Sequence, residues 1–173
     1  MGCLAGPVVA AAVILDFERI PSGIEDSKLL TPKSRQKLDG LIRESALCFG
    51  IGLAEVDEID TINIYHAARL AMRRAIQAMS SPPDFLLVDG RARLDVEIPQ
   101  LCIIKGDHLS VSIGAASIIA KVYRDALMAQ MDERYPGYEF ARHKGYGSVL
   151  HRERLQEKGP SPLHRKSFSW TPV

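Results

Sequence analysis

Three features that define common protein classes are missing from this sequence. No apolar run reaches the roughly 18 residues that a transmembrane helix needs, so we expect no membrane-spanning segment and no membrane partner. The three cysteines, Cys3, Cys48 and Cys102, lie far apart, which excludes a CxxC-type metal site and is typical of reduced thiols in a cytoplasmic protein. No GxxxxGK(S/T) phosphate loop follows a predicted strand, which disfavours a small-molecule α/β domain.

The overall composition suits one globular domain. The chain has 173 residues, of which 46% are hydrophobic and 25% charged, enough to bury a sizeable core. The apolar stretch at 2–15 has neither a basic n-region nor a cleavage-type site, so we interpret it as core rather than as a signal peptide. We therefore predict a single domain over residues 1–173.

The formal net charge of +1 hides an uneven distribution of basic residues. Because phosphate contacts depend on where cations cluster, a basic segment is a candidate nucleic-acid contact even in a nearly neutral chain. A solvated helix face explains the same composition about equally well. The clustered residues, opposed only by Glu153 and Glu157, are Arg142, His143, Lys144, His151, Arg152, Arg154, Lys158, His164, Arg165 and Lys166.

Hydrophobic periodicity predicts alternating strands and helices. In chain order these are a strand at 8–15, a helix at 32–45, a strand at 49–54, a long helix after 57, strands at 85–88 and 101–104, a helix at 110–131 and a short basic helix at 149–157. This order indicates an α/β sandwich. We place the α/β core at about 1–132 and a basic helical and loop region at about 133–173.

Local signals define several element ends. Thr31, followed by a proline, is typical of an N-cap with proline at the first helical position. Gly50 and Gly52 inside a strand indicate a bulge or the close approach of another backbone. Either Asp57 or Asp60 is expected to cap the long helix that follows.

Two aspartates, Asp89 and Asp107, each follow a hydrophobic strand. The carboxyl ends of neighbouring strands are where ligands bind in open α/β sheets, so the two carboxylates are expected to converge. Paired carboxylates suit Mg²⁺ or Mn²⁺, which keep waters and take further ligands from a substrate phosphate. A turn next to glycine is the ordinary alternative for each aspartate, and for the pair the two interpretations are evenly balanced.

The segment 143–148 places a basic pair and an aromatic residue in a glycine-rich loop. Lys144 and Tyr146 are the residue types that grip nucleic-acid phosphate and sugar. An ordinary helix-entry loop with Ser148 as N-cap is the alternative. Lys121 either reaches a phosphate or extends its charge to solvent.

Eight segments carry recognisable motifs in a fixed order. They are Gly2 to Leu15, Asp26-Ser27-Lys28-Leu29, Glu58-Ile59-Asp60 with Ile62-Asn63-Ile64, Leu87-Val88-Asp89-Gly90, Lys105-Gly106-Asp107, Ala115 to Val122 with Arg124-Asp125, His143 to Gly147, and His164-Arg165 with Ser167-Phe168. In sequence and order they resemble the signature blocks of the type 2 ribonuclease H family, ribonuclease HII. The resemblance covers Gly2 to about Phe168.

The resemblance implies a ribonuclease H-like mixed sheet flanked by helices. It also implies a monomeric endonuclease that uses two divalent ions, Mn²⁺ or Mg²⁺, to hydrolyse the RNA strand of RNA–DNA hybrids. Single ribonucleotides in duplex DNA would be cut as well, leaving 5′-phosphomonoester ends. Asp89 and Asp107 would be two of four metal-binding carboxylates.

The same resemblance assigns the substrate contacts. Tyr146 would sense the 2′-hydroxyl of the ribonucleotide. Lys121, Lys144, Ser27 and Lys28 would line the substrate backbone.

The sequence departs from the family pattern at the start of the chain. The family carries Asp-Glu-x-Gly-Arg-Gly on its first strand, and Gly2 matches the last glycine, a remnant of the 2′-hydroxyl reader. We therefore expect an N-terminally truncated member that lacks two carboxylates and is inactive as it stands. The alternative is a short product that binds hybrid duplexes without cutting. Because the first strand of the family is central, an open slot is expected between the strands at 8–15 and 85–89.

Overall fold

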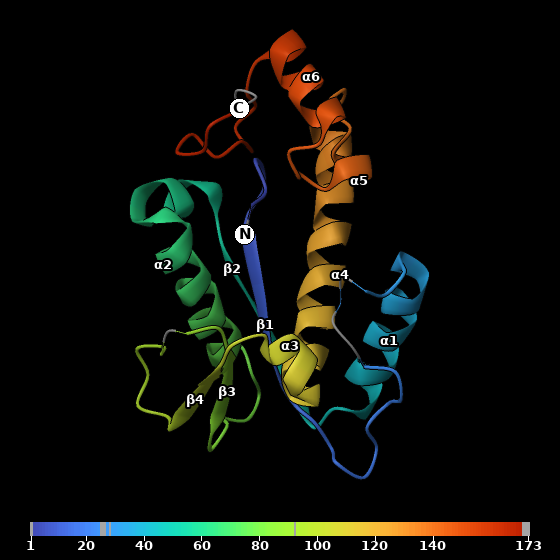
Figure 1. Cartoon of the computed structure of the whole chain (residues 1–173), viewed down its shortest axis with the longest axis vertical. Coiled ribbons are helices and arrows are strands. Elements are labelled where there is room, and N and C mark those ends of the chain that lie inside the picture. The colour runs from blue at the N-terminus through green and yellow to red at the C-terminus, as the bar shows by residue number, and fades with distance from the viewer. Residues whose placement is uncertain (1, 25–26, 28, 92, 171–173) are drawn as a thin grey trace. The chain divides into compact units, whose positions relative to one another are not determined.

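The computed structural model describes residues 2–24, 27, 29–91 and 93–170. Its elements follow the predicted order, with two additional four-residue helices, α3 and α5. None of the helices in these ranges is long and apolar enough to cross a bilayer. The elements in Figure 1 are β1 Val8–Ile14, α1 Pro32–Ser45, β2 Cys48–Ala54, α2 Val56–Gln77, β3 Leu86–Asp89, β4 Gln100–Ile103, α3 Gly106–Leu109, α4 Val111–Arg134, α5 Phe140–His143 and α6 Val149–Lys158.

Two predicted N-caps and one predicted backbone contact are confirmed. The Thr31 hydroxyl caps α1 by accepting the backbone N–H of Ser34 at 3.1 Å, and Ser148 caps α6 in the same way. In β2, a Cβ added to Gly50 or Gly52 would come within 2.1–2.2 Å of carbonyl oxygens of α2. Glycine there lets the strand and the helix backbone approach closely.

The start of α2 differs from the prediction. The helix begins at Val56, so neither Asp57 nor Asp60 is its N-cap. The backbone instead leaves helical conformation at Asn63, with φ 63° and ψ 165°. The Asn63 side chain accepts the N–H groups two and three residues further on, at 3.0 and 3.2 Å, and so caps a second helical segment. On that segment the predicted apolar face is buried at Ala67, Ala71 and Ala75.

The described strands form two separate two-stranded sheets. β1 pairs with β2, while β3 pairs with β4 in parallel, with Asp89 opposite Ile103. Within the described ranges β1 and β3 are therefore not hydrogen-bonded neighbours, as the sequence predicted. That an open slot separates them stays a prediction.

The chain divides into two compact units. The Tyr146 unit contains residues 2–8, 54–68 and 123–170, and its core is built around Ala5, Met128 and Phe140. The Asp89 unit contains residues 9–53 and 69–122 of the described chain. Its core joins α1 to the first half of α4, and a second cluster lies against β3. The single-domain assignment stays a prediction.

Candidate functional site

Asp89 lies at the carboxyl end of β3, where parallel pairing brings the end of β4 alongside it. The backbone N–H of Gly90 donates to the carbonyl oxygen of Ile103 at 2.9 Å. The backbone N–H of Gly106 then donates to the Asp89 carboxylate at 2.9 Å. Since Asp107 follows Gly106 directly, this bond brings the Asp89 carboxylate to the backbone that carries the second predicted acid.

This contact depends on glycine at position 106. A Cβ there would lie 2.5 Å from Cδ1 of Ile113 and 3.3 Å from the Asp89 carboxylate. The preceding Lys105 is in the left-handed conformation, with φ 57°, and turns the chain from β4 into α3. Asp107 therefore stands in the first turn of α3, beside the end of β3.

Asp89 and Asp107, called the acid pair from here on, offer hard oxygen donors, which are the ligands that Mg²⁺ and Mn²⁺ prefer. Across the described ranges, no group of three or more His, Cys, Asp or Glu side chains is placed to hold a metal. That Asp89 and Asp107 share a divalent ion, whose other ligands are waters and phosphate oxygens, stays a prediction.

Tyr146 lies in a loop of the Tyr146 unit that is fixed by its backbone. It forms an antiparallel bridge with Cys3, and its N–H donates to the carbonyl oxygen of His143 at 2.9 Å. Gly145, with φ +79°, makes this approach possible, because a Cβ there would come 2.5 Å from the carbonyl oxygen of Ala5. Tyr146 remains 45% exposed, as the sequence indicated.

Two buried arginines hold the segment 3–7 beside that loop. Arg124 donates to the carbonyl oxygens of Ala5 and Lys144 at 3.0 and 2.8 Å, and its guanidinium lies 5.6 Å from the centre of the Tyr146 ring. Arg165, 1% exposed, donates to the carbonyl oxygen of Gly6 at 3.0 Å. Burial lowers the pKa of Arg165 to about 10, so it stays charged at neutral pH. These arginines therefore fix the chain beneath Tyr146.

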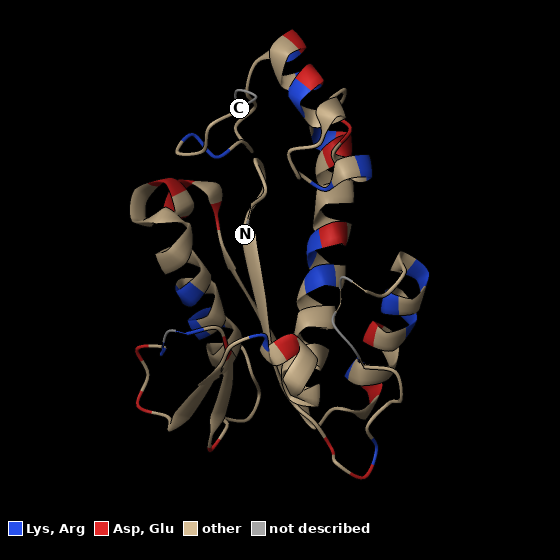
Figure 2. Cartoon of the chain, in the orientation of Figure 1, with Lys and Arg blue, Asp and Glu red and all other residues tan. Residues whose placement is uncertain are grey.

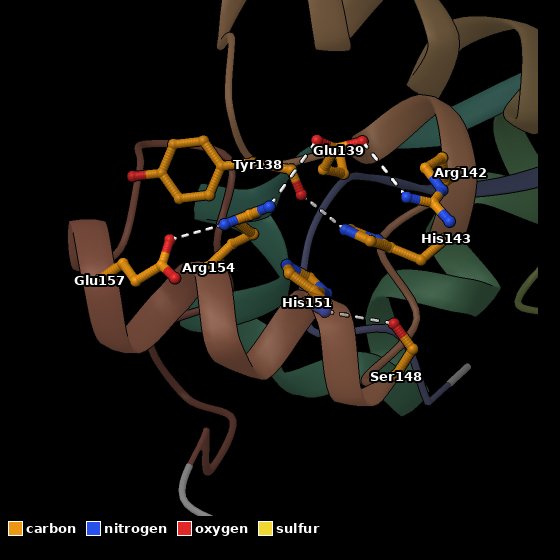
Figure 3. A network of polar contacts seen from close by, with 8 residues as sticks. All are labelled: Tyr138, Glu139, Arg142, His143, Ser148, His151, Arg154 and Glu157. Carbon is orange, nitrogen blue, oxygen red and sulfur yellow. Dashed lines mark hydrogen bonds and ion pairs between the residues drawn. The ribbon is translucent and has the colours of Figure 1, made fainter.

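Four members of the predicted basic cluster are buried: His143, His151, His164 and Arg165. Neither a phosphate-facing patch nor a solvated helix face is therefore the correct description of these four. Burial lowers the pKa of His151 and of His164 to about 4, so both imidazoles are neutral at pH 7. The His143 ring stacks on the His151 ring, with centroids 4.0 Å apart, and Figure 3 draws both residues.

The remaining basic residues are partly neutralised. Arg154 forms ion pairs with Glu157 at 2.7 Å and with Glu139 at 4.0 Å, and Figure 2 shows both signs of charge along α6. Lys144 is half-buried in left-handed conformation, with φ 51°. Arg142, Lys158 and Lys166 are the exposed members of the cluster, so its electrostatic footprint is smaller than the sequence indicated.

The other residues predicted to contact the substrate differ in their exposure and in their neighbours. Lys121 is half-buried on α4. Ser27 is 3% exposed, and its hydroxyl lies 2.8 Å from that of Ser117, while Lys28 is outside the described residues. Gly2 is exposed and precedes Cys3, the bridge partner of Tyr146. Substrate contact by these residues stays a prediction.

Sequence reasoning did not predict the partners of Asp60, whose carboxylate organises the C-terminal segment. Asp60 accepts the backbone N–H groups of Lys166 and Ser167 at 3.0 and 2.9 Å, and also the Ser167 hydroxyl. The pKa of Asp60 is lowered. Burial alone would raise this pKa, but the hydrogen bonds from Ser167 and Lys166 together outweigh the effect of burial. The partners are over 100 positions away, so no local pattern could have indicated them.

Comparison with known proteins places this arrangement in a family. The family model described as Ribonuclease HII matches residues 1–171. Ribonuclease HII of Geobacter sulfurreducens is 54% identical over 96% of this chain and 77% of its own length. The crystal structure of ribonuclease H2 from Pyrococcus horikoshii OT3 has a TM-score of 0.80 at 24% identity, over 98% of this chain and 90% of that one.

A second solved structure supports the same fold. Bst-RNase HIII in complex with Mn²⁺ has a TM-score of 0.75 at 18% identity, over 98% of this chain and 64% of its own. The predicted ribonuclease H fold is therefore confirmed. The chain belongs to the ribonuclease HII family, whose members are divalent-metal-dependent endonucleases that act on RNA–DNA hybrids.

Proposed function

We propose that Asp89 and Asp107 form part of a two-metal site that hydrolyses the RNA strand of hybrids and cuts at single ribonucleotides in duplex DNA. The products would carry 5′-phosphomonoester ends. The observation that carries this proposal is the hydrogen bond from Gly106 to Asp89, which joins the carboxylate at the end of β3 to the chain segment that presents Asp107.

The acid pair would hold the metal. Two divalent ions, Mg²⁺ or Mn²⁺, supply an activated water and stabilise the leaving 3′-oxygen when bound. Asp89 contributes a carboxylate whose orientation is set by the Gly106 N–H, and Asp107 contributes a second one from the first turn of α3. Their negative charges would offset part of the positive charge of the ions that they hold.

Recognition of RNA falls to the Tyr146 loop. Only RNA offers a 2′-hydroxyl, which both donates and accepts hydrogen bonds. Tyr146 presents an exposed ring on a backbone that is fixed on both sides, which suits stacking on a ribose and sensing its hydroxyl. Lys121, Lys144, Ser27 and Lys28 are proposed substrate contacts that supply affinity rather than selectivity, and Gly2 is proposed as a remnant of the 2′-hydroxyl reader.

By resemblance to the family, Asp89 and Asp107 are two of four carboxylates that hold the metal ions. The other two belong to the family motif Asp-Glu-x-Gly-Arg-Gly, whose last glycine matches Gly2. A chain that carries Asp-Glu-x-Gly-Arg before Gly2 is therefore expected to cut RNA–DNA hybrids.

The state of the three cysteines is the basis for the proposed cellular location. Cys3, Cys48 and Cys102 are all free thiols, which is typical of a reducing compartment such as the cytoplasm. We propose that the protein acts there as a monomer without an obligate protein partner.

Calorimetric titration of Mn²⁺ into the 173-residue chain tests whether the acid pair binds metal. We expect binding to be lost in Asp89→Asn and in Asp107→Asn, because each removes an anionic ligand. Asp84→Asn, an exposed acid before β3, is the matched control and should bind as the unmodified chain does. Unchanged affinity in both site variants would refute the shared metal site.

A further inference from the structure

The buried imidazoles of the Tyr146 unit make hydrogen bonds whose directions follow from their partners. A carbonyl oxygen only accepts, so Nδ1 of His151, 2.9 Å from the carbonyl oxygen of Tyr146, must donate. In a neutral imidazole the other nitrogen is then an acceptor. Nε2 of His151 therefore accepts from Nε2 of His164, 3.0 Å away.

The same reasoning extends the chain by one residue. With its proton on Nε2, His164 has an acceptor at Nδ1, which receives the backbone N–H and the hydroxyl of Ser161, both at 2.9 Å. These hydrogen bonds point one way, from Ser161 through two imidazoles to the Tyr146 carbonyl oxygen. The longer 3.3 Å contact between Nδ1 of His164 and the Ser161 carbonyl oxygen carries no proton. Both imidazoles are at most 1% exposed, so water does not substitute for a missing partner.

The third histidine secures the other side of the loop. Nε2 of His143 donates to the carbonyl oxygen of Tyr138 at 2.7 Å, and its Nδ1 accepts the backbone N–H of Gly145 at 3.1 Å. Figure 3 shows the His143 ring against that of His151, where α6 begins at its Ser148 cap. Gly145 and Tyr146 itself are therefore each held by a neutral imidazole.

We propose that His151 and His164 are positioning residues for ribonucleotide recognition, because their one-way hydrogen-bond chain fixes the backbone that presents the Tyr146 ring. This inference rests on the proposed role of Tyr146 as the reader of the 2′-hydroxyl. The Arg124 guanidinium near the ring and the His151 donor on the carbonyl oxygen together set the position of Tyr146. A residue at 164 that cannot donate leaves Nε2 of His151 without its partner and frees the loop to shift.

Binding selectivity of the 173-residue chain tests the proposal. Fluorescence anisotropy in Mg²⁺ would compare a DNA duplex with the same duplex containing one ribonucleotide. His164→Leu should lower the preference for the ribonucleotide by about 2- to 10-fold, the effect of one net hydrogen bond. His164→Gln places an N–H donor at the Nε2 position and should retain most of the preference. Phe140→Leu, which weakens packing beside the histidines without removing a polar group, should lower the melting temperature but keep the preference.

Nitrogen-15 NMR of the unmodified chain supplies a readout that needs no substitution. We expect the proton of His151 on Nδ1 and that of His164 on Nε2 at pH 7. The opposite tautomers, or a folded His164→Leu chain with unchanged selectivity, would overturn the proposal. If His164→Leu does not fold, the tautomers and the selectivity of His164→Gln decide. If Tyr146→Ala leaves the preference unchanged, the reader role of Tyr146 fails instead, and the positioning claim fails with it even where the tautomers are as expected.

Discussion

The acid pair and the Tyr146 loop are built in contrasting ways. Asp89 is exposed at a strand end, and its orientation is set by one backbone N–H from a neighbouring segment. The Tyr146 loop is instead held by a bridge to Cys3, by buried arginines and by buried histidines. We propose a division of labour in which adaptable carboxylates would take up ions that differ in size, whereas a rigid loop would discriminate between sugars that differ by one hydroxyl.

The largest expected effect is the loss of cleavage in an Asp107 variant. It tests the chemical role of the acid pair separately from the selective role of the Tyr146 loop. In a chain carrying Asp-Glu-x-Gly-Arg before Gly2, Asp107→Asn should reduce cleavage of an RNA–DNA hybrid by more than about 100-fold. This exceeds the 10- to 100-fold that typically follows loss of a residue merely supporting a metal ligand. Single-turnover cleavage assays measure it, with Asp84→Asn as the control. A loss below about 10-fold would remove Asp107 from the metal site.

Two glycine substitutions compare the rigidity of the regions. Gly145→Ala places a Cβ against a backbone oxygen at positive φ, so we expect about 2–4 kcal/mol of destabilisation. Gly106→Ala should cost less, because the Ile113 side chain that it meets can turn away. Urea unfolding measures both, and Gly23→Ala, at φ +85° in open space, isolates the cost of φ. An equal cost at 106 and 145 would contradict the difference in rigidity.

Acid should loosen the Tyr146 loop more than it loosens β3. In the folded chain the pKa of His151 and that of His164 lie near 4, well below the unfolded value of 6.5. The unfolded state therefore takes up protons first, and stability is lost as the pH falls from 6.5 toward 4, by up to about 1.4 kcal/mol per pH unit for each histidine. Above pH 6.5 this contribution is flat. Hydrogen exchange should quicken at 143–148 between pH 6.5 and 5 while β3 stays protected; equal acceleration in both would contradict the assignment.

The smallest effect concerns a helix that belongs to neither candidate region. Gly40 lies exposed in the interior of α1 and has nothing within 4 Å of the Cβ position. Gly40→Ala should stabilise the chain by about 0.5–1 kcal/mol through helix propensity alone, without changing metal binding or selectivity. Thermal melts and Mn²⁺ titration check this; a change in metal affinity would show that α1 is coupled to the acid pair.

The sequence predicted what local patterns encode and missed what long-range contacts decide. The N-caps at Thr31 and Ser148, the strand ends at Asp89 and the close approach at Gly50 all follow from residue type and spacing. The capping role of Asp60 was wrong because the helix begins at Val56, and its carboxylate instead accepts hydrogen bonds from a segment over 100 positions away.

The buried histidines were also beyond local reasoning. Composition marks His151 and His164 as basic surface residues, and only the fold shows that they face each other in a core with matched donors and acceptors. Arg124 and Arg165 were read as signature positions, yet their bonds to carbonyl oxygens of the segment 3–7 depend on that segment being placed beside them.

Cleavage of a duplex containing one ribonucleotide tests the central claim most directly. The chain carrying Asp-Glu-x-Gly-Arg before Gly2 should cut it in Mn²⁺ or Mg²⁺, leave a 5′-phosphate and spare the matching all-DNA duplex. Tyr146→Ala should reduce cutting by about 5- to 150-fold, the loss expected from one stacking contact, while all-DNA binding is nearly unchanged. Equal cutting of both duplexes, or undiminished cutting by the Asp89→Asn, Asp107→Asn double variant, would contradict the account.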